Sequence, residues 1–121
     1  MIKPLIIGVL TELLKFEPRR EITGFLLAYQ NEEQELVRVR NLSMNQYSFF
    51  IADSDIDDVK RYALKNNTTI YAFVHSHNGT TDMSEHDKMT FESSEFNWII
   101  IALYEEQLKW QFYSKKQKIL K

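Results

Sequence analysis

The chain has 121 residues, of which 44% are hydrophobic and 26% charged, with a formal net charge of −2 and no cysteine. This length and composition predict one soluble globular domain that spans residues 1–121. The missing cysteines exclude disulfides, thiolate metal ligands and a cysteine nucleophile, and the charge balance gives no reason to expect a nucleic acid partner. We find neither a stretch long enough to span a membrane nor a convincing signal peptide, so we expect no membrane partner and a cytoplasmic location.

The first half of the chain is expected to form one helix and three strands. Hydrophobic residues at helical spacing predict a helix over 4–16. An apolar strand over 22–29 contains Gly24, which indicates a bulge or a close approach of another backbone. Alternating apolar and basic residues over 36–40 are typical of a half-exposed antiparallel strand, and a short apolar run predicts a further strand over 49–52.

A second helix is expected over 53–66, with Asp53 or Ser54 as its N-terminal cap. More aspartates fill its first turn, where they complement the helix dipole. They lack the spacing and the glycine of a calcium-binding loop, so the dipole explains them without a metal.

The second half of the chain begins with a buried strand over 69–74, which is followed by a helix that runs to about Ser93. The run 97–104 is almost continuously apolar and predicts a central strand, and the amphipathic run 108–113 predicts the last one. Residues 114–121 are expected to be a frayed tail. The order of elements predicts an α/β fold in which helices pack against one mixed sheet.

All three histidines fall within residues 75–87. His75 and His77 follow the strand over 69–74, and residues two apart on a strand point to the same side, so both imidazoles are expected to aim at one point. Asp87, ten residues after His77, is a possible third ligand. Two imidazoles, one carboxylate and one open position are how proteins hold a catalytic zinc ion.

Two further residues bear on amide hydrolysis, which needs a base and a donor to the developing oxyanion. Ser84 is expected to cap the helix with Asp87 at its third position, and this spacing puts the Ser84 hydroxyl beside a metal held by Asp87. Glu21 stands at the start of the strand over 22–29, beside Arg19 and Arg20. From spacing alone, Glu21 is better explained as a solvated charge than as a base.

The segment His75-Ser76-His77, followed by Ser84-Glu85-His86-Asp87, resembles the JAMM motif of the MPN-domain (JAB) metalloproteases. That motif also has an upstream glutamate just before a glycine-containing strand, and Glu21-Ile22-Thr23-Gly24 resembles this segment. The resemblance covers nearly the whole chain. It implies an MPN/JAB-like curved mixed sheet flanked by helices, layered as in cytidine deaminases, in a minimal, bacterial-type member.

The resemblance also implies a role for each of five residues. His75, His77 and Asp87 would bind Zn²⁺. Glu21 would deprotonate the attacking water and then protonate the leaving amine, and Ser84 would donate to the oxyanion. Members of the family that lost activity lack some of these residues, so their presence argues against a purely structural member.

Two departures from the family pattern lie between the second histidine and the serine. Asn78 stands where the family usually has proline, and the loop 78–83 is one residue shorter than usual. The shorter loop would make Asp82 or His86 alternative ligands, but the retained Ser-x-x-Asp spacing favours Asp87.

The function implied by the resemblance is that of a zinc-dependent peptidase or isopeptidase. Its substrate would be a ubiquitin-like or sulfur-carrier protein, cut after the C-terminal glycine tail as a deubiquitinase cuts. One alternative is a non-catalytic MPN interaction module that zinc only stabilises. A second is a DNA-repair-associated JAB protein, which the acidic charge balance argues against.

Overall fold

The computed structural model describes residues 1–17, 21–45 and 48–115 of the chain. The elements follow in the order α1 (Pro4–Phe16), β1 (Thr23–Ala28), β2 (Gln34–Val39), α2 (Asp53–Lys65), β3 (Thr69–Ser76), α3 (Glu85–Ser93), β4 (Trp98–Tyr104) and β5 (Gln107–Tyr113). Within these ranges, every helix is too short or too polar to cross a membrane.

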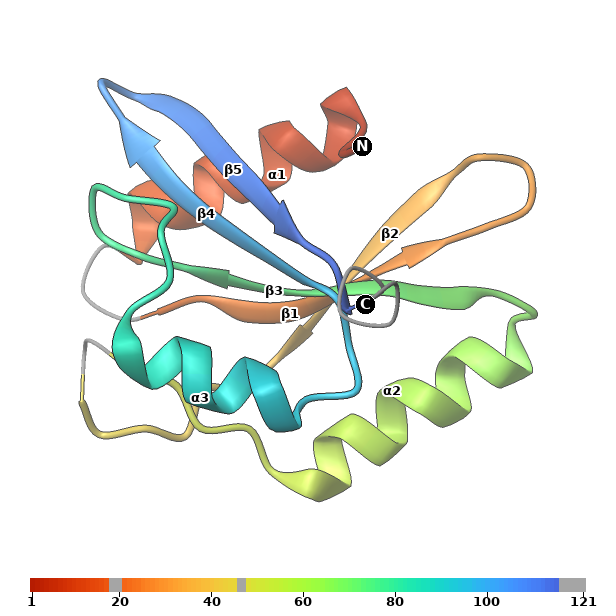
Figure 1. The fold of residues 1–121 in the computed structure, drawn as a ribbon. Coiled ribbons are helices and arrows are strands. Elements are labelled where there is room, and N and C mark those ends of the chain that lie inside the picture. Colours follow the sequence, from red (N-terminus) through yellow and green to blue (C-terminus); the bar gives the residue numbers. More distant parts are fainter. Residues whose placement is uncertain (18–20, 46–47, 116–121) are drawn as a thin grey trace.

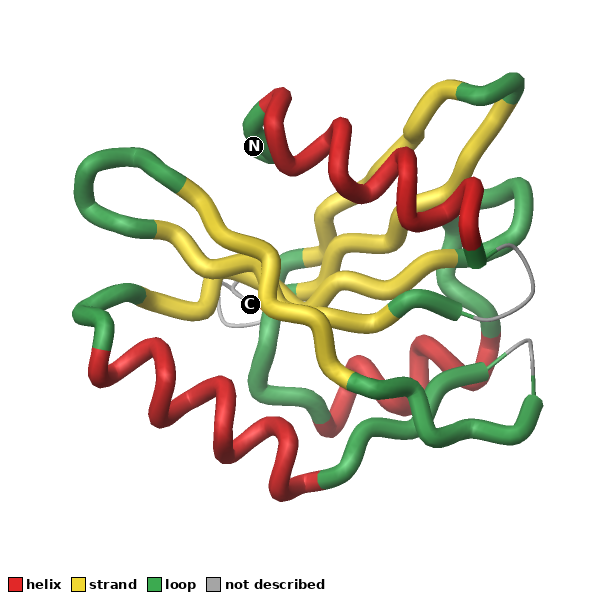
Figure 2. Tube along the Cα trace, turned by 180° about the vertical axis from the view of Figure 1, so that it is seen from behind, coloured by secondary structure: helices red, strands yellow, loops and turns green. Residues whose placement is uncertain are grey.

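The strands form one sheet in the order β2-β1-β3-β4-β5. β3 and β4 pair in parallel and the other neighbours pair antiparallel, so the sheet is mixed, as predicted. Its strands fan out in Figure 1, which shows the twist expected of such a sheet. α1 lies on one face of the sheet and α2 and α3 lie on the other, which gives three layers (Figures 1 and 2).

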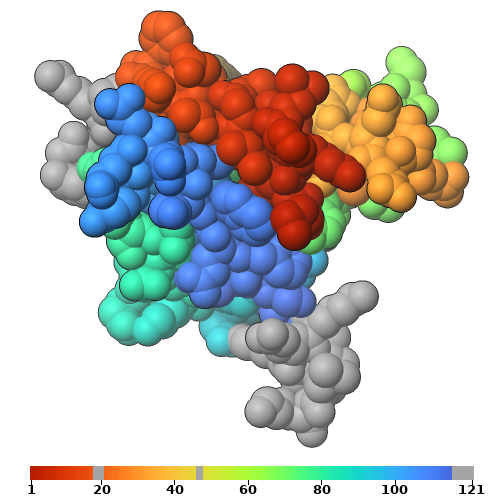
Figure 3. Space-filling model, turned by 90° about the horizontal axis from the view of Figure 1, so that it is seen from above, coloured from red at the N-terminus to blue at the C-terminus, as the bar shows by residue number. Residues whose placement is uncertain are grey.

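The sheet face under α1 is packed with aliphatic side chains, and we call it the aliphatic face. The buried residues of α1 recur at helical spacing, and every second residue of the central strands meets them. The buried cluster consists of Ile2, Ile6, Leu10, Leu14, Ile22, Leu26, Ala72, Val74, Ile99 and Ile101. Viewed from this side, α1 is the outermost element, beside the β4–β5 hairpin (Figure 3).

The opposite sheet face, under α2 and α3, is rich in aromatic side chains, and we call it the aromatic face. Its buried cluster consists of Phe25, Leu27, Val39, Ile51, Val59, Phe73, Phe91 and Trp98. The ring of Phe73 lies 5.2 Å from that of Phe25 and 5.7 Å from that of Trp98, separations at which aromatic rings attract one another. His75 follows Phe73 on the same face of β3, so this aromatic layer continues into the histidine pair.

Gly24 confirms the predicted close backbone approach. A Cβ atom at this position would lie 2.9 Å from the carbonyl oxygen of Val37 on the neighbouring strand β2. The pairing of β1 with β3 also contains a register shift between Leu26 and Leu27. Glycine therefore lets β2 approach β1 just after the segment that contains Glu21.

The predicted strand over 49–52 is wrong, because this segment is an irregular loop. Phe50 makes one backbone contact, in which its carbonyl accepts from the Leu42 N–H at 2.8 Å, and its own N–H donates to the side chain of Asn41 at 3.0 Å. A side chain thus takes the place of the next ladder bond. The segment is apolar because Phe49 and Ile51 pack on the aromatic face. Two strands, not three, therefore precede α2.

The predicted cap of α2 is also wrong. The helix begins at Asp53, so Ala52 occupies the N-cap position. Its methyl side chain has no acceptor for a capping hydrogen bond. Asp53 and Asp55 lie in its first turn, where they face the positive end of the helix dipole. Arg19, Arg20 and most of the predicted frayed tail, 116–121, lie outside the described residues.

Candidate metal centre

Antiparallel pairing between β1 and β3 brings Glu21 to the histidine pair. Thr23 lies opposite His75 in this pairing, so Glu21, two residues earlier, falls opposite His77, two residues later. Alternation along the strands puts all four side chains on the aromatic face. The glutamate that spacing alone left as a solvated charge is therefore buried next to the histidines, and 9% of its surface is exposed.

Ser76 holds the two strands together at this end of the sheet. Its N–H donates to the carbonyl of Ile22 at 3.1 Å, and its hydroxyl oxygen accepts from the Ile22 N–H at 2.8 Å. The N–H of His77 then donates to the carbonyl of Ile101 on β4 at 2.8 Å. The backbone of the histidine segment is thus fixed on both sides, at the carboxyl ends of the parallel strands β3 and β4, where open α/β sheets place their ligand sites.

His75 is fully buried among rings. Its imidazole lies 4.7 Å from the Phe49 ring, 4.8 Å from Trp98 and 5.5 Å from Phe73, measured between ring centroids. Neither ring nitrogen has a hydrogen-bond partner in the described part of the chain. Polar atoms buried in this way are rare in folded proteins and call for a ligand or another explanation.

The ligand atoms of Glu21, His75 and His77 all lie within 4.8 Å of one another. Asp87 contacts both histidines: its Oδ2 lies 2.8 Å from His77 Nε2, and its Oδ1 lies 3.6 Å from His75 Nε2. Residues from β3, from the start of β1 and from α3 thus meet at one place. The third ligand role of Asp87 and the base role of Glu21 remain predictions.

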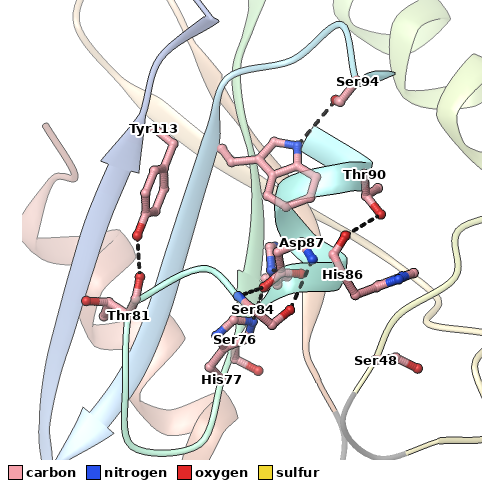
Figure 4. A network of polar contacts seen from close by, with 12 residues as sticks. Ser48, Ser76, His77, Thr81, Ser84, His86, Asp87, Thr90, Ser94 and Tyr113 are labelled. Carbon is pink, nitrogen blue, oxygen red and sulfur yellow. Dashed lines mark hydrogen bonds and ion pairs between the residues drawn. The ribbon is translucent and has the colours of Figure 1, made fainter. Parts of the chain in front are cut away.

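Ser84 and Asp87 confirm the predicted helix cap. Ser84 Oγ accepts from the Asp87 N–H at 3.0 Å, while the Ser84 N–H donates to Asp87 Oδ2 at 3.1 Å, which is a capping box (Figure 4). The cap therefore fixes the carboxylate that contacts the histidines. Because Ser84 Oγ acts here as an acceptor, its own proton is left to donate to another group.

The shortened loop 78–83 is tied to the end of the sheet. The hydroxyl of Tyr113 on β5 donates to the carbonyl of Thr81 at 2.7 Å (Figure 4). Asp82 is exposed and its N–H donates to the side chain of Thr80. The side chain of His86 points away from Asp87 in Figure 4. The group of close ligand atoms consists of Glu21, His75 and His77 and includes none of Asp82, His86 and Asp87. Of these three, Asp87 is the one that contacts both histidines, and its ligand role remains a prediction.

Burial raises the pKa of Glu21 to about 7. The positive charge that His77 can carry lowers this pKa and the charge of Asp87 raises it, but both effects are smaller than that of burial. A general base works best when its pKa lies near the working pH. The pKa of Glu21 therefore suits a group that must take up a proton and give it back at neutral pH.

The pKa shifts of His75 and Asp87 favour metal binding, whereas the shift of His77 favours the protonated imidazole, which cannot bind a metal. Burial lowers the pKa of His75, which favours the neutral imidazole that a metal needs. Burial opposes ionisation of Asp87, but its contacts with the two imidazoles outweigh this and hold its pKa below the usual range. Burial also opposes the charge on His77, but the contact with Asp87 raises its pKa overall.

These residues fit a zinc ion. Among the described residues, the buried side-chain atoms that lack a hydrogen-bond partner are both ring nitrogens of His75 and the Oε1 atom of Glu21, together with one oxygen of Asp55 elsewhere on α2. A metal bound by His75, His77 and a carboxylate would satisfy the imidazole nitrogen that otherwise lacks a partner. Nitrogen and oxygen donors in this combination are those that zinc takes in catalytic sites.

Sequence reasoning did not find the aromatic residues that surround His75. Phe49 was assigned to a strand, and nothing in the spacing of Phe73 and Trp98 distinguished them from ordinary core residues. Their role follows from the register, because Phe73 pairs with Trp98 across β3 and β4. A signal existed only in the alternation of β3, which puts Phe73 and His75 on one face.

The fold and the site together define a JAB-type α/β domain. The chain belongs to the family of prokaryotic homologs of the JAB domain, whose model matches residues 7–113. This confirms the family to which the JAMM-like motif pointed. No curated protein matches the chain in sequence.

Solved structures share the fold at low sequence identity. The chain is similar to the solution structure of protein DSY2949 from Desulfitobacterium hafniense, with a TM-score of 0.75 and 16% identity over 91% of this chain and 80% of that one. It is also similar to a protein from Salinibacter ruber, with a TM-score of 0.58 and 18% identity over 91% of this chain and 78% of that one. These likenesses support the three-layered fold.

Proposed function

We propose that this protein is a zinc-dependent peptidase or isopeptidase. The observation that carries the proposal is the meeting of Glu21 with His75 and His77 at a buried strand end, where the atoms of two of them lack partners. A purely structural cluster would gain nothing from burying these groups unpaired, since each costs about 1–3 kcal/mol. Zinc would supply a Lewis acid that lowers the pKa of water to about 7 and polarises the scissile carbonyl.

The chain's own residues would then divide the work. His75, His77 and Asp87 would hold the metal, and the rings around His75 would keep bulk water from it. The Glu21 carboxylate would accept a proton from the attacking water and deliver it to the leaving amine, so that water and an amide become a carboxylate and an amine. The Ser84 hydroxyl would donate to the oxyanion of the tetrahedral intermediate.

The proposed substrate is the C-terminal glycine tail of a ubiquitin-like or sulfur-carrier protein. This part of the proposal rests on the family resemblance and on the residues that match the motif. The cleaved bond would join the tail either to a lysine side chain of another protein or to a following peptide segment.

Metal analysis and a cleavage assay test the proposal. We expect the purified protein to bind about one zinc ion per chain. We expect it to cleave a ubiquitin-like protein extended beyond its Gly-Gly end, and a chelator should stop the reaction until zinc is restored. Glu21→Gln should retain zinc and lose at least about a hundredfold in kcat. Full zinc-dependent cleavage by Glu21→Gln would refute the role given to Glu21.

A second candidate is a non-catalytic interaction module, favoured by the direct contact of 2.8 Å between His77 and Asp87. In that case His77, Asp87 and the Ser84 cap would serve only to fasten α3 to the sheet. This candidate predicts bound zinc, or none, together with no turnover of any ubiquitin-like fusion. It also predicts that Glu21→Gln leaves every measurable property except stability unchanged.

A further inference from the structure

A pocket with a volume of about 420 Å³ lies on the aromatic face, apart from the metal-binding residues. It is bounded by the loop before α2, by α2 itself and by the segment that follows α3. Its apolar wall consists of Phe25, Phe49, Phe50, Ile51, Ile56, Phe73, Phe96 and Trp98. The volume falls within the range of small-ligand pockets, about 300–1,000 Å³. Glu21, His75, His77 and Asp87 do not line it.

The polar lining of this aromatic pocket carries negative charge. Asp53 from α2 and Glu95 from the segment after α3 both line it, and its lining includes no lysine or arginine. The imidazole of His86 on α3 also lines it. Glu95 already pairs with Lys60, whereas Asp53 has no ion-pair partner in the described ranges 1–17, 21–45 and 48–115. Ring faces and a carboxylate both attract cations.

The hydroxyl groups of Thr90 and Ser93 can offer a ligand only acceptors. Thr90 Oγ1 donates its proton to the carbonyl of His86 at 3.0 Å, and Ser93 Oγ donates to the carbonyl of Thr90 at 3.2 Å. Ser94 Oγ differs, because it accepts from the indole N–H of Trp98 at 3.2 Å and from the Phe96 N–H at 3.1 Å and keeps its own proton to donate. Hydroxyls whose protons are committed to carbonyls retain free lone pairs, so this wall suits a ligand rich in N–H donors.

At the rim of the pocket, a cation of the chain itself already lies beside a carboxylate and an aromatic ring. The ammonium of Lys60 lies 2.8 Å from the Glu95 carboxylate and 5.8 Å from the centre of the Phe96 ring. The ring of Phe50 lines the pocket, and 61% of its surface is exposed. It is therefore available to contact the residues next to an inserted side chain. The backbone of a polypeptide would gain an apolar contact with that ring. A free amino acid would instead bring its carboxylate close to Asp53, and the two negative charges would repel each other.

We propose that the aromatic pocket binds an arginine side chain presented by a partner protein. The guanidinium is planar, stacks on aromatic rings and has five N–H donors for the acceptors of this wall. Asp53 neutralises its charge, the hydroxyls of Thr90 and Ser93 accept from it, and Phe50 covers the adjoining backbone. The inference does not rest on the proposed hydrolytic function, because Glu21, His75, His77, Ser84 and Asp87 do not line the pocket. Its wall shares Phe49, Phe73 and Trp98 with the surroundings of His75.

The test is a titration of the full chain followed by NMR. The probe is N-acetyl-arginine-N-methylamide, and the matched control is its citrulline counterpart, which has the same shape without the charge. We expect saturable shifts at the indole N–H of Trp98 and at the amides of Ser94 and Phe96, with the citrulline probe binding about tenfold more weakly. The indole of Trp110, which packs on the aliphatic face, should not shift.

Two exposed positions locate the binding site without endangering the fold. Asp53→Asn and Phe50→Ala should each weaken the arginine probe by about fivefold. Asp57→Asn removes an exposed aspartate of the same helix that does not line the pocket, and it should leave binding unchanged. The dispersion of the spectrum reports whether each variant is folded.

Three results would overturn the proposal. Equal binding of the arginine and citrulline probes would show that the pocket does not recognise charge. Shifts that survive Asp53→Asn and Phe50→Ala would place the probe elsewhere. Free L-arginine binding as tightly as the blocked probe would identify a small-molecule site in place of a docking site for a partner protein.

Discussion

Both faces of the sheet are covered by helices, but the side chains that pack beneath the helices differ between the two faces. The aliphatic face is closed by one helix, α1, and the buried polar side chain on this side of β3, Ser76, is hydrogen-bonded to the Ile22 N–H. The aromatic face is closed by α2, α3 and an irregular loop, and it includes His75, whose buried ring nitrogens make no hydrogen bond within the described part of the chain. The first face has the composition of a core that serves only stability. The second contains groups that stability alone does not explain.

The difference follows from the alternation of β3. Val74 points to the aliphatic face, while Phe73 and His75 point to the aromatic one. Adjacent residues of one strand therefore serve packing and chemistry separately. Aromatic rings suit the second task, because they surround an imidazole tightly and still leave its edge open to a ligand.

Leu10→Ala should have the largest effect on stability. Leu10 is 1% exposed within the aliphatic cluster, so its truncation should lower the free energy of unfolding by about 3 kcal/mol. Urea denaturation measures this loss, while zinc binding by the folded fraction should remain. Leu5→Ala is the matched control, because Leu5 lies on the same helix and is 78% exposed. Equal losses for both variants would contradict the assignment of the aliphatic face.

His75→Leu should act in the opposite direction on the metal-free protein. The His75 imidazole makes no hydrogen bond within the described residues, and its 3.6 Å contact with Asp87 is too long for one. Replacing it with an apolar side chain removes a buried polar group, so we expect the free energy of unfolding to rise by about 2 kcal/mol. The same change should abolish zinc binding. Denaturation in the presence of a chelator, together with metal analysis, measures both effects.

The control for that variant is His86→Leu, which alters an exposed histidine that points away from the site. Its free energy of unfolding should stay within about 0.5 kcal/mol of the parent value. A His75→Leu variant that is destabilised without metal would show that His75 has a structural role on the aromatic face.

Glu21→Gln should produce the smallest change, visible as a pH dependence. The pKa of Glu21 rises from 4.5 to about 7 in the folded, metal-free protein, so the folded state holds this proton more tightly than the unfolded state. Glu21 therefore adds stability that is fully present below pH 4.5 and is lost as the pH rises to about 7. A glutamine side chain does not ionise, so at this position it makes no pH-dependent contribution to stability.

Relative to the parent, Glu21→Gln should thus gain stability across this pH range. We expect about 1 kcal/mol, less than the full pKa shift implies, because solvent partly screens this edge of the sheet. Denaturation at several pH values with a chelator present measures the difference. Glu17→Gln, at an exposed glutamate just after α1, is the matched control, and a difference for Glu21→Gln no larger than for this control would contradict burial of Glu21.

Much of the fold could be predicted from local patterns. The helices over Pro4–Phe16 and Glu85–Ser93 were expected from hydrophobic spacing and from the Ser84 cap, and both are confirmed. The central position of β4 followed from its unbroken apolar run. The segment 49–52 was assigned wrongly, because an apolar run indicates burial and does not by itself indicate a strand partner.

The sequence by itself determined the candidate metal site as a set of residue types. Spacing of two puts His75 and His77 on one side of a strand, and spacing of three joins Ser84 to Asp87 in one cap, because both are local rules of backbone geometry. The family likewise follows from the motif and is confirmed over residues 7–113.

Only the tertiary structure decided the surroundings of that site. Glu21 reaches the histidines because β1 pairs with β3 in one particular register, over more than fifty intervening residues. Phe49 and Trp98 enclose His75, although one comes from the loop before α2 and the other from β4. Only the folded chain brings these segments together. Burial, the raised pKa of Glu21 and the aromatic pocket all result from contacts between distant segments, which no local pattern of residues encodes.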